Sequence, residues 1–358
     1  MGPFHHAYHF DQALVGKYLR RKSAGIEIVD AQVMGANRGE NGDIASLVLD
    51  DGAPLKADFF IDCTGFRRLL ITDLGAKWLS YSDILPINRA MPFWLDHRPG
   101  VEIPPCTLAW AQSCGWLWSI PTQGRIGCGY VYSDRHTSPD KAQAEIEAVL
   151  GHRIEPRNDI KIDAGRLDKP WIGNCLALGL SSSFLEPLEA TSIHGTIVQL
   201  MIFSQFHLKH PTKFTIQERA DYNAAVARQV DDFRDFIALH YVSERDDSVF
   251  WRDVKGQFLG ENTRKKLDHW ARTMPSARDF RPFPGRFPHV ETTLHYPVLD
   301  GLGLLDQQTA KADLAKNPAL RALGRKNVET LTKEYRLASS KALGHRAFLE
   351  TFKQGHSP

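Results

Sequence analysis

The sequence has 358 residues, 42% of them apolar, so it can bury a large core. Its net charge is +2, from 44 basic and 42 acidic residues, which gives no strong positive electrostatic field to attract a nucleic acid or an anionic membrane. It contains no apolar run near the roughly eighteen residues of a membrane span, and its N-terminus lacks the basic-then-apolar order of a signal peptide. Because its five cysteines show no CxxC or zinc-ligand spacing, we expect a cytoplasmic protein with reduced thiols, no metal, and no nucleic-acid or membrane partner.

The first predicted elements are a capped helix and three strands. Asp11 is placed to cap a helix that runs from Gln12 towards Arg21. The third strand is apolar and stops at Asp62-Cys63-Thr64-Gly65, as buried strands do at a ligand-facing loop of an α/β sheet. Turn sequences rich in Asn, Asp and Gly separate the three strand-like runs, which are 26–38, 45–52 and 55–65.

The region from Asp83 to Tyr132 is predicted to form an antiparallel sheet. Its β-like runs include LAWAQS, GWLWSIP and IGCGYVYS. In GWLWSIP, Trp116 and Trp118 point to the same face of a strand, and Pro121 ends the pairing. Taken alone, this pattern indicates two aromatic side chains that pack one face of a sheet.

The stretch SSSFLEPLEATSIHG (181–195) places two carboxylates between a strand at 174–180 and a helix expected to begin near Pro187. One interpretation is that both carboxylates cap the helix, and for Glu186 this is the stronger interpretation. The other rests on the free amides that open the helix, which favour an anion such as a halide, a phosphate or the edge of a reduced flavin. Glu189 beside such a site could hold a proton donor or offset cationic charge on a substrate ring.

The C-terminal part is predicted to be mostly helical. Helical patterns extend from Ile193 to about Ala271, and again over 306–353. A loop rich in Pro and Phe, at 281–290, separates them.

Six segments, in order, resemble the flavin-dependent halogenases of the tryptophan halogenase family. GWLWSIP fits the WxWxIP signature, and GLSSSFLEPLEATSI resembles the GLSSxFxEPLESTGI segment. The others are FFIDCTGFRRLL, GRIGCGYVYS, DDFRDFIALHYVSERDDSVFW and, more weakly, GLGLL. A lone WxWxIP would be a weak signal, but ordered matches over most of the chain are strong. The sequence is therefore identified as a member of this family.

The resemblance implies an α/β fold of the FAD/NAD(P)-binding, glutathione-reductase-like kind, with an antiparallel sheet and a mostly helical C-terminal lobe. The family opens with a βαβ unit that carries GxGxxG and a lysine, and we find no such motif in this sequence. We therefore expect an N-terminally truncated halogenase with weak FAD binding and no turnover. Residues 1–195 would be the remainder of the FAD-binding module with its antiparallel sheet, and residues 196–358 the helical lobe on the substrate side.

The function implied by the resemblance is halogenation of an electron-rich, indole-type aromatic through hypohalous acid. The implied cofactor is FAD in its reduced form, FADH2, and the halide is chloride or bromide. The implied partners are a separate flavin reductase and a small aromatic substrate, with a homodimer as one option. Two alternatives stay open: a flavin-dependent aromatic monooxygenase, and a truncated, non-catalytic remnant of a halogenase.

The resemblance also assigns roles to single residues. Glu189 corresponds to the glutamate that assists electrophilic attack. The other assignments are the amides of Thr191 and Ser192 for the halide, Leu180 and Ile193 for the flavin ring, Asp62 and Gly65 for the approach to the dinucleotide, and Trp116 with Trp118 for shielding the flavin.

The sequence departs from the family at two places. Ser192 stands where the tryptophan halogenases have glycine, which predicts backbone strain at Ser192 and a wider pocket that favours bromide. The segment 281–305 lacks the aromatic clamp of the free-tryptophan enzymes, so we expect a smaller indole or another aromatic as substrate. The aromatics Phe287, His289 and Tyr296 in this segment are interpreted as packing residues.

Overall fold

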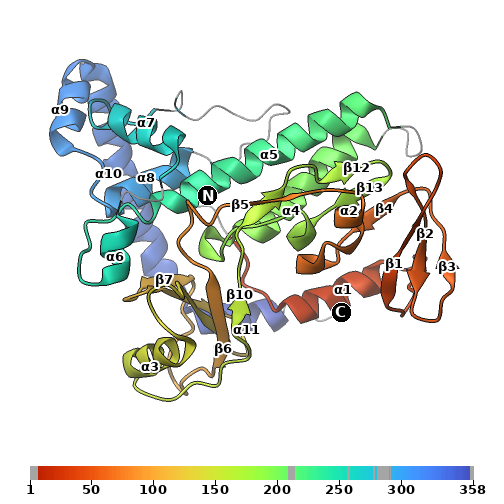
Figure 1. Ribbon diagram of the computed structural model, residues 1–358. Coiled ribbons are helices and arrows are strands. Elements are labelled where there is room, and N and C mark those ends of the chain that lie inside the picture. Colours follow the sequence, from red (N-terminus) through yellow and green to blue (C-terminus); the bar gives the residue numbers. More distant parts are fainter. Residues whose placement is uncertain are drawn as a thin grey trace.

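The computed structural model describes residues 7–208, 214–255, 259–276, 279, 290 and 292–354. Figure 1 shows two long helices, α4 and α5, beside the short strands β12 and β13, with a separate sheet below them near α3. The helices within the described residues are α1 (Gln12–Lys22), α2 (Leu69–Asp73), α3 (Pro139–Leu150), α4 (Thr191–Ile202), α5 (Ile216–Leu239), α6 (Val249–Val254), α7 (Glu261–Trp270), α8 (Thr292–Gly301), α9 (Gln307–Ala315), α10 (Pro318–Lys341) and α11 (His345–Gln354).

The strands of the described residues form four sheets. The largest has the order β10 (Ile160–Lys161), β6 (Arg89–Leu95), β9 (Ile126–Tyr132), β8 (Gly115–Pro121) and β7 (Leu108–Ala111). The others are β1 (Val33–Arg38), β2 (Ile44–Leu49) and β3 (Pro54–Leu55); β14 (Ser183–Phe184), β11 (Gly165–Leu167) and β5 (Trp78–Ser80); and β12 (Trp171–Ile172), β13 (Cys175–Ala177) and β4 (Phe60–Asp62).

The five-stranded sheet is antiparallel throughout, which confirms the prediction for the region between Asp83 and Tyr132. The rings of Trp116 and Trp118 lie with their centroids 6.3 Å apart, as expected for neighbours on one face of β8. Gly129 on β9 makes this possible, because a Cβ there would lie 2.0 Å from the Trp118 ring. Gly129 of GRIGCGY therefore serves side-chain packing in this sheet.

The first predicted strand is wrong in its N-terminal half. Only Val33–Arg38 pairs, because the partner β2 has six residues and its ladder ends at Val33. Ile26 and Ile28 lie outside the ladder with 67% and 52% of their surface exposed. The helix predicted from Gln12 is confirmed, and the Asp11 carboxylate accepts hydrogen bonds from the amides of Ala13 and Leu14.

The parallel pair β13 and β4 brings two candidate regions together. Leu176 on β13 pairs with Ile61 on β4, so both strands end side by side. The chain leaves β4 at Asp62 and leaves β13 towards Ser181. The residues predicted to approach a dinucleotide therefore lie next to the segment that carries the two glutamates.

Helices α4 and α5 lie side by side and run antiparallel (Figure 1). The ring of His194 contacts that of Phe233, with centroids 5.7 Å apart. Further along α4 the chain enters a π-helical segment, Phe203–His207, and there the rings of Phe203 and Tyr222 have centroids 6.2 Å apart. This pairing sets which side chains of the two helices face each other.

The C-terminal part is helical, as predicted, over α5 to α7 and again over α9 to α11. Phe287, His289 and most of the 281–290 loop lie outside the described residues. Tyr296 is a packing residue whose hydroxyl donates to the carbonyl of Pro275 (2.9 Å). None of the helices in the described parts is both long and apolar enough to cross a bilayer.

Candidate active site

Glu186 is the buried carboxyl group of the candidate site. Only 1% of its surface is exposed, and the Tyr241 hydroxyl donates to both carboxylate oxygens, at 2.8 and 3.0 Å. Burial raises the pKa of Glu186 to about 8, against the opposing effects of Tyr241 and of the nearby Trp116 indole. The carboxylate is bonded to a side chain of the helical lobe, so the capping interpretation of Glu186 is wrong.

Glu189 lies in a more open position. Its side chain is 38% exposed, and its Oε1 atom is 3.3 Å from Nε2 of His240. Helix α4 begins at Thr191, after Ala190 at the N-cap, and it has no side-chain cap. The capping interpretation of Glu189 is therefore wrong. A 3-10 helix, Leu188–Ala190, does begin after Pro187 as predicted, but a kink at Glu189 and Ala190 separates it from α4, which begins at Thr191.

The dipeptide His240-Tyr241, directly after α5, contacts both glutamates. His240 reaches Glu189 and Tyr241 reaches Glu186, over sequence separations of 51 and 55 residues. Sequence reasoning missed both partners. The available signal was their place in the segment DDFRDFIALHYVSERDDSVFW, which the resemblance had picked out as a whole.

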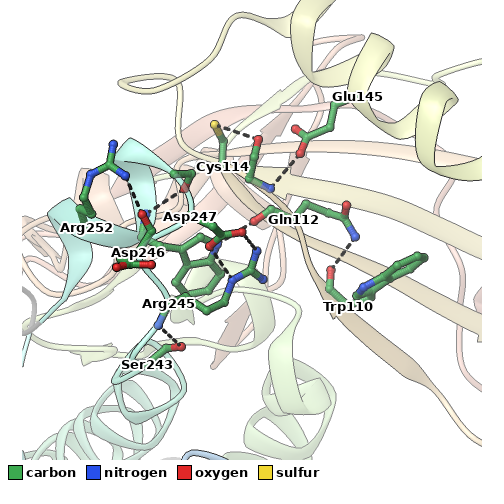
Figure 2. Close-up of polar contacts among 12 residues, drawn as sticks. Trp110, Gln112, Cys114, Glu145, Ser243, Arg245, Asp246, Asp247 and Arg252 are labelled. Carbon is green, nitrogen blue, oxygen red and sulfur yellow. Dashed lines mark hydrogen bonds and ion pairs between the residues drawn. The ribbon is translucent and has the colours of Figure 1, made fainter.

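A polar and aromatic cluster fixes the segment that presents this dipeptide (Figure 2). The guanidinium of Arg245 lies over the Trp251 ring, 4.8 Å from its centroid, and pairs with Asp247. The Trp251 indole donates to the carbonyl of Gln112, in the turn between β7 and β8 (2.7 Å). The turn before β8, the strand that carries the two tryptophans, is therefore held to helix α6, and Arg245 in the segment after α5 packs on the same Trp251 ring.

The turn before α4 has an unusual backbone. Glu189 and Ala190 both have left-handed conformations, with φ of 61° and 52°. Each such non-glycine residue costs about 1–2 kcal/mol, and such strain is found at functional sites. Ser192 is helical and lies inside α4, so the prediction of backbone strain at Ser192 is wrong. The strained backbone is that of Glu189 and Ala190.

Replacing Ala190 with glycine should stabilise the chain by about 1 kcal/mol, because glycine adopts a left-handed conformation without steric cost. Chemical denaturation would measure the gain. Gly16→Ala is the reverse substitution, in the regular helix α1. A Cβ there meets no neighbour, so alanine should stabilise the chain because glycine weakens a helix. An Ala190→Gly variant less stable than the parent would contradict the assignment of strain to this turn.

The residues proposed for the halide lie at the start of α4. The amides of Thr191 and Ser192 belong to the first turn of α4, and a 3-10 helix, Leu188–Ala190, runs directly into this turn. Ala190 at the N-cap makes no side-chain cap, so this end of the helix, with the positive end of its dipole, suits an anion.

Asp62 is fully buried, and its carboxylate is occupied within the protein. It accepts hydrogen bonds from the amide and hydroxyl of Thr64, the amides of Leu70 and Ile71, and the Ser181 hydroxyl. The Ser181 hydroxyl also donates to the carbonyl of Gly65 (3.1 Å). Asp62 therefore positions the loop after β4 and is not free to contact a cofactor, whereas Gly65 lies on that loop.

The two residues predicted to contact a flavin ring are both accessible. Leu180 is half-buried at the end of the β13 segment, and Ile193 is 42% exposed on the first turn of α4. Trp118 is half-buried and Trp116 is buried, in the same core as Leu188. Trp116 thus shares a core with the glutamate segment, and Ser181 links the start of that segment to Asp62 and Gly65.

Comparison with known proteins gives consistent results. The family model described as tryptophan halogenase matches residues 1–309. The chain is 33% identical to the tryptophan 6-halogenase SttH of Streptomyces toxytricini over 96% of its length, and 36% identical to the tryptophan 7-halogenase RebH of Lentzea aerocolonigenes over 84%. It spans 67% of the first of these enzymes and 59% of the second.

Solved structures agree with the sequence comparison. The crystal structure of SttH superposes with a TM-score of 0.85 at 29% identity, covering 95% of this chain and 67% of that one. BrvH, a flavin-dependent halogenase from Brevundimonas sp. BAL3, gives 0.84 at 32% identity, covering 95% and 68%.

Proposed function

The chain belongs to the tryptophan halogenase family, and on that premise we propose that it carries the halide and acid groups of a reduced-flavin-dependent halogenase that acts on an electron-rich aromatic. The observation that supports this most is the strained turn that places the Glu189 carboxylate two residues before the uncapped amides of Thr191 and Ser192. An anion and an acid are thereby held next to each other at one helix end.

Several residues fit the ring of a flavin. Ile193 and Leu180 offer accessible apolar surface beside the proposed halide amides, and flat aromatic rings bind against such surface. With molecular oxygen as the oxidant, bound reduced FAD would supply the chemistry that converts chloride or bromide to hypohalous acid, and the second oxygen atom would leave as water. The residues of this chain would hold the ring and the halide, and Trp116 and Trp118 would shield the site.

Glu189 is proposed to act on the substrate. Electrophilic halogenation passes through a cationic ring, which a nearby carboxylate stabilises and then relieves of its proton. His240 lies within reach of Oε1 and orients this carboxylate. Glu186, bonded to Tyr241 inside the core, is proposed to hold the segment in place.

The proposed substrate is a small indole or another electron-rich aromatic, and the proposed partner is a separate flavin reductase that supplies FADH2 by diffusion. The rival reaction is hydroxylation by a flavin monooxygenase. Mass spectrometry of the product, made with and without halide, separates the two. A product that gains oxygen in both conditions would contradict the proposal.

In an enzyme that also carries the GxGxxG unit and the lysine of the family, Glu189→Gln is expected to lower turnover by a factor of about 10², because the neutral amide neither offsets the ring charge nor accepts its proton. Turnover is measured as halogenated product with a flavin reductase present. Glu244→Gln, an exposed carboxylate paired with Lys255, is the matched control and should leave turnover unchanged. Equal rates for the Glu189 variant and its parent would remove the catalytic role.

A further inference from the structure

A pocket lies between β14, α4 and α5, directly behind the start of α4. It has room for about one water molecule. The residues that line it include Thr191, Ser192, Gly195 and Gln199 from the α4 side, and Gln229 and Phe233 from α5. The pocket therefore adjoins the two residues whose amides are proposed to bind the halide.

Three polar side chains in this pocket are buried and carry polar atoms without a hydrogen-bond partner. Thr191, Gln199 and Gln229 are 5%, 2% and 0% exposed. Within the described parts of the chain, the Thr191 hydroxyl, Oε1 of Gln199, and both Oε1 and Nε2 of Gln229 have no hydrogen-bond partner. An unsatisfied buried polar group costs about 1–3 kcal/mol, so this many in one pocket point to an occupant.

The pocket extends along α4. From Thr191 to Gln199 the helix rises about 12 Å, at 1.5 Å per residue. Gly195 lies halfway, and a Cβ there would meet no atom within 4 Å, so the missing side chain leaves open space. The antiparallel packing of α4 and α5 places Gln229 beside this middle region.

The hydrogen-bonding groups differ between the two ends of the pocket. The α4 end offers donors: uncapped amides, the Thr191 hydroxyl and the positive helix dipole. The deeper part offers carboxamides, which both donate and accept. A bare halide only accepts hydrogen bonds, so it would leave the carboxamide oxygens unsatisfied. Water beside the halide satisfies both groups, because it donates to the ion and to the oxygens.

We propose that this pocket is a hydration pocket, in which Gln199 and Gln229 hold water that stays with a halide bound at the amides of Thr191 and Ser192. This inference rests on the halide site of the proposed function and adds the residues that set its selectivity. Removing water from an ion costs more for a small ion than for a large one. A pocket that retains part of the hydration shell therefore lowers the cost of binding chloride more than that of binding bromide.

The test is a titration of the 358-residue chain with sodium chloride and, separately, sodium bromide, read as the rise in its thermal unfolding temperature. A ligand at free concentration c that binds only the folded state stabilises it by RT ln(1 + c/Kd), so the dependence of this temperature on halide concentration gives the dissociation constant. Gln229→Leu should raise the dissociation constant for chloride about tenfold and that for bromide about threefold or less, since hydrogen bonds to charged groups contribute about 1.5–3 kcal/mol. The variant should fold, because an apolar group of similar size replaces an unsatisfied amide.

Two further variants sharpen the result. Gln217→Leu, on an exposed position of α5 where the amide donates to Asp221, is the matched control and should bind both halides like the parent. Gln229→Glu adds a negative charge inside the pocket at alkaline pH, where a buried carboxyl group is ionised, and should there weaken both halides by about tenfold or more.

The outcomes separate the inference from the function on which it rests. Halide binding that is unchanged in both Gln229 variants would overturn the hydration pocket and leave the amide site intact. A parent chain that no halide stabilises would overturn the pocket and the halide site together. A selective loss of chloride in Gln229→Leu supports the pocket whatever product the enzyme makes.

Discussion

Replacing Asp62 with alanine is expected to lower the free energy of unfolding by about 3–5 kcal/mol. The carboxylate accepts five hydrogen bonds inside the protein, and three of the donors are backbone amides that cannot reorient towards water. Removing their common acceptor leaves buried donors without partners. Denaturation with guanidinium chloride measures the loss, provided that the dependence of the unfolding free energy on denaturant concentration is similar in the two variants.

Two controls belong with this experiment. Asp58→Ala removes an exposed carboxylate just before the same strand and should change stability by about 0.5 kcal/mol or less. Asp62→Asn keeps an acceptor oxygen but adds two amide protons that need acceptors, so we expect an intermediate loss. A loss below about 1 kcal/mol in Asp62→Ala would show that the loop after β4 does not depend on this carboxylate.

Elements with local signals could be predicted from the sequence. Helix α3 has local signals at both ends: Ser138 caps its start, Pro139 suits its first turn, and Gly151 takes the left-handed conformation after its end. Trp116 and Trp118 could be placed on one face because strands alternate strictly. The start of α4 could not be placed, because tertiary contacts impose the left-handed turn at Glu189 and Ala190 on residues that do not favour it.

The candidate site could be predicted only in part. The stretch at 181–195 was found, but the roles of its glutamates could not be separated, because the partner that buries Glu186 lies 55 residues away. Gln199 and Gln229 gave no signal, since each stands singly in a helical pattern. Buried polar groups are recognised only when the packing of two helices shows what surrounds them.

The Glu186→Gln variant is expected to gain stability over its parent as the pH rises. In the unfolded chain the glutamate has its ordinary pKa of 4.5, whereas burial raises the pKa of Glu186 in the folded protein to about 8. Between these values the unfolded state has lost its proton and the folded state keeps it, so unfolding becomes easier with rising pH. The parent should lose up to about 1.4 kcal/mol per pH unit in this window.

Denaturation at pH 5.5 and pH 7.5 would measure the effect. Relative to the glutamine variant, the parent should lose about 2–3 kcal/mol between these two conditions. The comparison of the two proteins cancels other groups that titrate in the same range. Glu155→Gln, at an exposed position, controls for the change in net charge. Parallel pH profiles for the parent and Glu186→Gln would mean that Glu186 is ionised in the folded protein.

Tyr241→Phe distinguishes burial from hydrogen bonding as the origin of this pH dependence. The Tyr241 hydroxyl donates to both oxygens and lowers the pKa of Glu186 against the larger effect of burial. Its removal should extend the loss of stability to higher pH, because the ionised carboxylate then has no donor hydroxyl. His240 and, through it, Glu189 should also be held less firmly, since one dipeptide contacts both glutamates. Glu189 is held by the same dipeptide as the buried Glu186. We therefore expect halide binding to weaken over the same pH range in which the protein loses stability.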